Sequence, residues 1–341
     1  MRREFDVAAV VLALALAFAA TVIGVRTGWH PADADEIVYR DTLVLMRHRA
    51  GFYDAQRQAL ILKEHAPPTS VRAIRPPTIY LVLRWFPPSS WRWLVGLVYL
   101  ADLLLVWRLA RAHGPPAGLL AVAVAGIWVL GFTMYLFLHA EVWGLPFFLA
   151  GLLAVRREKP WAAAALFLVA ASIRELYVVG LLGGILFTLT AGGSRRHSRA
   201  LPWLTGLAAG AALYAVQVAL SLGVLSARGY NARFGNEHRT LSFLLRLVAP
   251  INSGPGELFG VAATVLGIAG CARLARRDAA AAVAGTGSVA LLLASVWATR
   301  VYWSACWALP IAAFLPAALG ISDRRPARPA APEPAPVAVA C

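Results

Sequence analysis

The sequence has few cysteines and few charged residues for its length. Of 341 residues only three are cysteines, Cys271, Cys306 and Cys341, and no two of them form a CxxC pair. No histidine lies near them at the spacing of metal ligands, so the sequence indicates neither a zinc site nor a disulfide framework. Charged residues make up 14% of the chain and hydrophobic residues 60%. This composition argues against a soluble α/β protein and favours an integral membrane protein.

Lysine is almost absent, since Lys63 and Lys159 are the only two among 32 basic residues. A chain rich in arginine and alanine and poor in lysine is typical of a GC-rich bacterial genome. The formal charge of +15 would suggest a nucleic-acid partner in a soluble protein. Here the arginines occur in short clusters between apolar runs, as in loops between membrane spans. We therefore expect no nucleic-acid partner. We attribute the positive charge to the loops between the spans of a protein in a bacterial cell membrane.

The basic clusters predict how the chain crosses the membrane. If all of them face the cytoplasm, each stretch between two clusters must cross twice. This predicts an all-α polytopic membrane protein with about ten transmembrane helices and both termini in the cytoplasm. The clusters are Arg2 and Arg3; Arg108 and Arg111; Arg156, Arg157 and Lys159; Arg195, Arg196 and Arg199; Arg273, Arg276 and Arg277; and Arg324, Arg325 and Arg328.

The two ends of the chain differ in character. The apolar run from Val7 to Val25 has the length of a membrane span and no clear cleavage site before Arg26, which favours an uncleaved first span over a signal peptide. Residues 323–341 are rich in Pro and Ala, so we expect a disordered cytoplasmic tail after a transmembrane domain of residues 1–322.

The stretch from Trp161 to Ala191 tests the topology. Its length would allow one long tilted helix or two short ones broken at Arg174 and Glu175. One helix would place the basic clusters on its two flanks on opposite sides of the membrane. We therefore predict two short spans that meet at Arg174 and Glu175.

The first extracytoplasmic loop, residues 26–90, begins with three acidic residues. Asp33, Asp35 and Glu36 precede an apolar pattern that predicts a helix ending at Gly51. Asp33 is the expected N-cap, with Glu36 three residues later. Asp35 either interacts favourably with the positive end of the helix dipole or has a catalytic role. In the catalytic reading, one carboxylate at the membrane surface takes a proton from an acceptor hydroxyl.

Three short motifs of this loop, and a fourth near the end of the chain, together resemble a known family. Asp35-Glu-Ile-Val-Tyr39, Gly51-Phe-Tyr53 and Arg75-Pro-Pro-Thr-Ile-Tyr80 follow one another after the first span, and Arg300-Val-Tyr-Trp303 precedes Pro310. Their order resembles that of GT-C glycosyltransferases, membrane enzymes that use polyprenyl-phosphate sugars. The similar branch contains protein mannosyltransferases and lipid A aminoarabinose transferases.

The resemblance implies a GT-C-like fold with a long helical first loop, and an enzyme. It implies that Asp35 is the base and that sugar passes with inversion from a polyprenyl-phosphate donor to a lipid, glycan or protein acceptor outside the cytoplasm. Glu36 and Arg300 are carried over as substrate-binding residues. Arg75 stands where the family has a basic residue, often lysine, and a cation there would offset the charge of the phosphate leaving group.

Four more ionisable residues fall at the predicted outer ends of spans: His139, Glu141, Arg174 and Glu175. Such residues are costly unless paired or facing water. One reading is an ion pair of Arg174 with Glu175 or Glu141 that joins short helices. The other is a substrate site, with Arg174 near the phosphate and Glu141 or His139 near the sugar or acceptor. Two acids and a histidine are also possible ligands of a divalent metal, but no ligand spacing supports one, so no metal or cofactor is assigned.

Two other functions compete with the glycosyltransferase. A secondary transporter or lipid flippase would place charged residues near the membrane midplane, at breaks between inverted halves. No such repeat is visible, and the charges fall at span ends. A membrane scaffold protein without chemistry would use the first loop as a docking surface, and composition alone leaves that alternative open.

Overall fold

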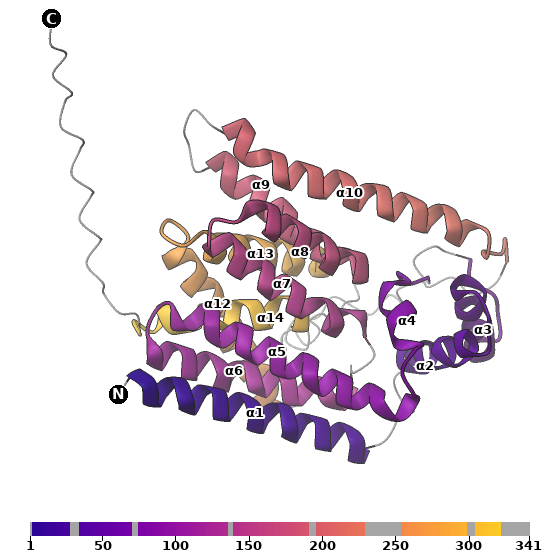
Figure 1. Cartoon of the computed structure of the whole chain (residues 1–341), viewed down its shortest axis with the longest axis horizontal. Helices are drawn as coiled ribbons and strands as arrows, with labels where there is room; N and C mark the ends of the chain where they lie inside the picture. The colour runs from indigo at the N-terminus through magenta and orange to yellow at the C-terminus, as the bar shows by residue number, and fades with distance from the viewer. Residues whose placement is uncertain are drawn as a thin grey trace, which may run out of the picture.

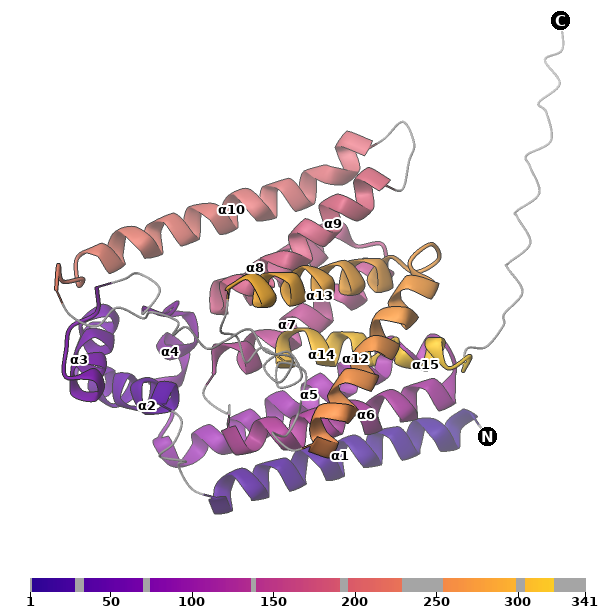
Figure 2. The ribbon, with the colours of Figure 1, turned by 180° about the vertical axis from the view of Figure 1, so that it is seen from behind.

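The computed structural model describes residues 2–27, 34–69, 74–135, 139–190, 196–228, 254–298 and 304–321. The described residues form helices and turns, with no β-strand among them. The bundle helices run back and forth between two ends of the molecule (Figures 1 and 2). They are α1 (Arg2–Thr27), α5 (Trp91–Arg111), α6 (Pro115–Tyr135), α7 (Ala140–Arg156), α8 (Pro160–Ile173), α9 (Val179–Thr190), α10 (Arg196–Leu222), α12 (Gly254–Leu274), α13 (Ala279–Ala298), α14 (Ser304–Ala312) and α15 (Leu315–Ala318).

Four of the described helical segments are long and apolar enough to cross a membrane: Arg3–Arg26, Pro88–Arg111, Ala200–Leu222 and Pro255–Leu274. Shorter apolar helical segments accompany them, at Pro115–Gly131, Pro160–Ile173, Glu175–Thr190 and Ala279–Leu291. These are the helices of a membrane protein, and the coarse fold class expected from composition is confirmed.

Much apolar surface lies on the outside of the bundle. Phe18 of α1 is 64% exposed and Val216 of α10 is 57% exposed, and α10 packs mainly along α8 and α9 (Figure 2). Exposing so large an apolar surface to water would be unfavourable, whereas the apolar lipid tails of a bilayer can cover it.

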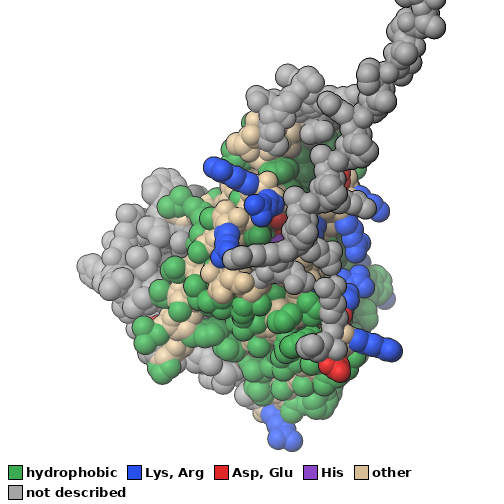
Figure 3. Space-filling view, turned by 90° about the vertical axis from the view of Figure 1, so that its left-hand side faces the viewer, with side chains coloured by type: hydrophobic (Ala, Val, Ile, Leu, Met, Phe, Trp, Pro, Cys, Tyr) green, Lys and Arg blue, Asp and Glu red, His purple; other side chains and the backbone are tan. Residues whose placement is uncertain are grey.

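Polar contacts join several helix ends at the basic end of the bundle, the end that carries the N-terminus. Arg111 at the end of α5 pairs with Asp6 in α1, and Arg156 at the end of α7 pairs with Asp278 between α12 and α13. Arg273 donates to the carbonyl of Ala317, 3.1 Å away. Figure 3 looks onto this end and shows Lys and Arg side chains standing out from a largely hydrophobic surface. The basic loops among the described residues therefore gather at one end.

The opposite end carries the helices of the first loop: α2 (Ala34–Arg47), α3 (Phe52–Glu64) and α4 (Thr78–Leu83) (Figure 1). The 3₁₀ turn η2 (Pro88–Ser90) follows α4 and leads into α5. The expected helix end at Gly51 is wrong. Arg49 adopts the left-handed conformation with φ 71°, and Gly51 is extended and stands at the N-cap position of α3. The chain thus turns two residues earlier than the glycine predicts.

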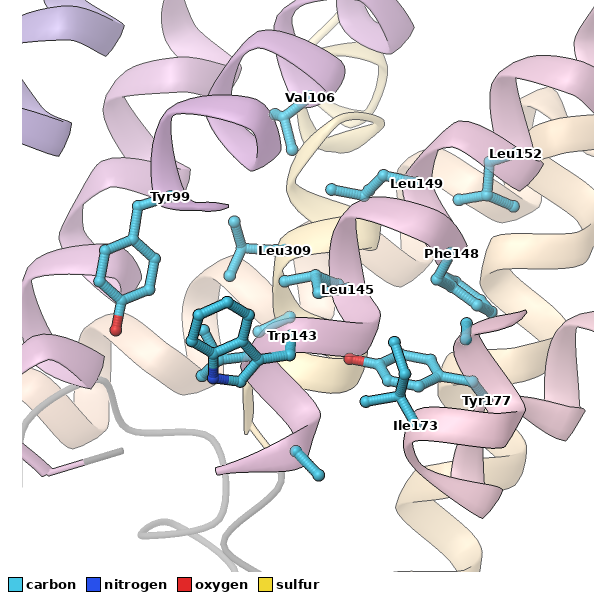
Figure 4. Packing of buried hydrophobic residues seen from close by; sticks show 14 of the residues in the cluster. Tyr99, Val106, Trp143, Leu145, Phe148, Leu149, Leu152, Ile173, Tyr177 and Leu309 are labelled. Atoms are coloured by element: carbon cyan, nitrogen blue, oxygen red, sulfur yellow. The ribbon is translucent and has the colours of Figure 1, made fainter. Parts of the chain in front are cut away.

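The break expected in the stretch from Trp161 to Ala191 is present. The helix α8 ends at Ile173, Arg174 is extended at φ −147° and ψ 117°, and a 3₁₀ turn η3 (Glu175–Val178) leads into α9. Tyr177 of this turn packs against α7 so closely that a Cβ on Gly144 would lie 2.4 Å from its Cε2. Figure 4 shows its ring beside Phe148, with a centroid distance of 5.3 Å. These contacts hold the break between α8 and α9 against the core.

Candidate functional site

A buried ion pair joins the first turn of α7 to the break after α8. The Nε of Arg174 lies 2.7 Å from Oε1 of Glu141, and the two side chains are only 4% and 7% exposed. The Nη1 of Arg174 also lies 3.0 Å from Oε1 of Glu175, whose side chain is 42% exposed. Both pairings considered from the sequence are present together, because the extended backbone at Arg174 turns its side chain toward α7.

His139 links this ion pair to the first loop. It occupies the N-cap position of α7, and its Nδ1 lies 3.8 Å from Oε2 of Glu141. Its ring meets Tyr39 of α2 edge to face, with a centroid distance of 5.2 Å and an interplanar angle of 85°. Tyr39, which follows Asp35 in the first loop, thus contacts His139, about a hundred positions later in the chain.

Arg75 is held by both long helices of the first loop. Its Nε donates to the hydroxyl of Tyr39 at 3.0 Å, and its backbone N–H donates to Oε1 of Gln56 on α3 at 2.9 Å. Gln56 is fully buried, and its Nε2 has no hydrogen-bond partner among the described residues. Arg75 also lies close enough to interact electrostatically with Glu141 and Arg174.

Two hydrogen bonds fix these elements to one another. Thr78, at the start of α4, donates from its hydroxyl to the carbonyl of Ser172 at the end of α8, 2.6 Å away. The hydroxyl of Tyr177 donates to the carbonyl of Glu141. The loop segment that carries Arg75 is therefore tied to the same break that carries Arg174.

The cluster of Arg75, His139, Glu141, Arg174 and Glu175, here called the polar cluster, contains most of the expected substrate-binding residues. Its two arginines and two glutamates have formal charges that sum to zero. Guanidinium groups bind phosphate in a bidentate manner, and carboxylates and imidazole accept or donate protons. The cluster thus combines groups that suit a phosphate ester with groups that suit a sugar or an acceptor hydroxyl.

The remaining expected residues are placed less fully. Asp35 and Glu36 lie in the first turn of α2, and position 35 comes one helical turn before Tyr39, on the same side of the helix. Asp33 and Arg300 lie outside the described residues. Within the part of the chain that the structure describes, no group of three or more His, Cys, Asp and Glu side chains is arranged to hold a metal ion.

Sequence reasoning missed two residues of this site, Gln56 and Tyr177. Gln56 lies on the apolar face of α3 with Phe52, Ala55, Ala59 and Leu60, where a lone amide interrupts a helical pattern. A buried polar residue at such a position requires a partner, and that signal was available. Tyr177 gave no such signal, because aromatic residues also belong in cores and interfaces.

No known protein family, no curated protein and no solved structure matches this chain.

Proposed function

We propose that the protein is a membrane glycosyltransferase that moves a sugar from a polyprenyl-phosphate donor to an extracytoplasmic acceptor, with a GT-C-like architecture. Asp35 acts as the base, Arg75 and Arg174 bind the donor phosphate, and the other residues of the polar cluster contact the sugar or acceptor. Glu36 and Arg300 complete the proposed site.

One observation carries this proposal. Arg75 of the first loop and Arg174 of a later break, both singled out in the sequence, lie together around Glu141, and Tyr39 contacts both Arg75 and His139. The cluster lies at the end of the bundle opposite the basic loops. A lipid-linked phosphate that approaches from the bilayer would meet two guanidinium groups there, and cations in that position stabilise the phosphate as it leaves the sugar.

The proposed topology has about ten spans, with the basic end in the cytoplasm and the polar cluster outside. The contacts that gather the described basic loops at one end support it. Reporter fusions after Arg196 and after Asn236 are expected to give opposite locations. The same location for both would refute the shared outer site.

The test of function uses the purified protein and a labelled polyprenyl-phosphate sugar. The proposal expects transfer of label to an acceptor hydroxyl or to water. A transporter would move the lipid or sugar across a vesicle membrane without cleaving it, and a scaffold would do neither.

The variant Asp35→Asn keeps the shape of the side chain but removes the base. It should bind the donor normally and transfer sugar about a hundred to ten thousand times more slowly, the usual contribution of a positioned general base. Asp33→Asn is the matched control, because asparagine is also a good helix cap. Near-normal transfer by Asp35→Asn would remove Asp35 from this role.

A further inference from the structure

Exposed aromatic side chains lie where the first loop returns to the bundle. Trp85 is 76% exposed and Trp93 is 52% exposed, on either side of the turn from α4 into α5. Leu81, Val82 and Phe86 add exposed apolar side chains beside them. We call these five residues, with Arg47, Arg84 and Arg92, the rim surface. It is separate from the polar cluster, to which none of these residues belongs.

The rim surface lies at the level where two candidate spans end. The span Pro88–Arg111 begins within it, and the span Arg3–Arg26 ends beside it. Nη1 of Arg92 donates to the carbonyl of Val25 at 3.0 Å, which ties the end of α1 to the start of α5. If both helices lie in a bilayer, the rim surface lies in the headgroup layer. Tryptophan favours that layer, because its ring is apolar and its N–H is polar.

The charge of the rim surface has one sign. No aspartate or glutamate occurs between Glu64 and Asp102, so Arg84 has no acidic neighbour nearby in the sequence. Cζ of Arg84 stands 4.8 Å from the centre of the Trp85 ring. Arg47 donates to the carbonyl of Phe86 at 3.1 Å, which uses one of its five N–H donors. The contact of Arg47 with a carbonyl and that of Arg84 with a ring hold these two arginines around the exposed rings without an opposite charge.

We propose that the rim surface binds anionic phospholipid headgroups of the leaflet in which α5 begins, and that this contact holds the first loop against the membrane. Guanidinium groups bind phosphate bidentately, and the rings insert between headgroups. The loop that carries Arg75 and Tyr39 would thereby be held beside the bundle through lipid as well as through protein contacts.

The test measures amide hydrogen exchange of the full-length protein in lipid nanodiscs. One set contains phosphatidylcholine alone, and the other contains about one third phosphatidylglycerol. Amides of residues 81–93 are expected to exchange more slowly in the anionic discs. Each arginine near an anionic surface contributes an attraction equivalent to about fivefold in an equilibrium constant. Arg47→Gln and Arg84→Gln should therefore each reduce the difference between the discs by about that factor.

The matched control is Arg57→Gln, which removes an exposed arginine on α3 of the same loop and should leave the difference unchanged. Trp85→Ser should speed exchange in both kinds of disc, because the ring inserts whatever the headgroup. Equal exchange of the unaltered protein in both discs would overturn the proposal. So would an equal effect of Arg57→Gln, or protection of residues 81–93 only after polyprenyl phosphate is added. None of these outcomes depends on sugar transfer, so the proposal stands or fails apart from the proposed function.

Discussion

The ion pair between Arg174 and Glu141 makes a quantitative prediction. Both side chains are more than nine-tenths buried, and Nε and Oε1 are 2.7 Å apart. Removing one partner of a buried pair costs about 3–5 kcal/mol, since the other charge stays buried. In Glu141→Gln, Arg174 keeps Glu175 at 3.0 Å, and the remaining carboxylate is partly in solvent. We therefore expect a loss in the free energy of unfolding near the lower limit, about 3 kcal/mol.

A double-mutant cycle separates the pair from the individual side chains. Arg174→Met keeps much of the length of the side chain and removes the charge. The double variant should lose less than the sum of the single variants, with a coupling of about 1–3 kcal/mol. Unfolding in mixed detergent micelles, followed by circular dichroism as the fraction of denaturing detergent rises, measures each free energy.

The matched control is the pair of neighbours Arg40 and Asp41 on α2, whose side chains are 38% and 26% exposed. Asp41→Asn should cost less than about 1 kcal/mol, because solvent reaches this partly exposed pair and screens it. Additive losses in the cycle would refute the reasoning, and so would a loss in Glu141→Gln as small as that of the control. Donor binding gives a second outcome: if Arg174→Met weakens it far more than Glu141→Gln does, Arg174 has a role beyond the ion pair.

Two further predictions concern other parts of the molecule. Burial would raise the pKa of Asp278, but the hydrogen bond with His113 and the charge of Arg156 outweigh burial and hold the pKa at about 2. A carboxyl group with a lowered pKa stabilises the fold at pH values above its ordinary pKa near 4, and this stabilisation is lost as the pH falls toward 2. The free energy of unfolding, measured against pH, should therefore fall by roughly 2 kcal/mol in this window. Asp278→Asn should abolish this pH dependence. Gln56→Leu should remove the acceptor for the N–H of Arg75 and raise the KM for donor more than it lowers kcat, whereas Gln56→Glu keeps an acceptor and should restore KM. Equal effects of both Gln56 variants on KM would assign Gln56 to packing alone.

Local patterns in the sequence determined the membrane character and the helix break. Apolar runs of the length of a bilayer predicted the long helices, because length and composition are properties of the segment itself. The basic clusters on either side of residues 161–191 predicted the break, since one continuous span would place them on opposite sides of the membrane, and Arg174 and Glu175 marked its position. The acidic start of the first loop likewise predicted α2, although its end depended on Arg49 rather than on Gly51.

Only the tertiary structure decided which groups meet. The sequence left open whether Arg174 pairs with Glu141 or Glu175, and the extended backbone after α8 gives it both. A lone amide on an apolar helix face indicated that Gln56 needs a partner, but nothing local identified that partner as the N–H of Arg75 or showed that Tyr39 joins Arg75 to His139. These contacts join segments far apart in the chain, so they depend on how the helices pack. Side-chain periodicity fixes which face of a helix is apolar, but not which helix it will meet.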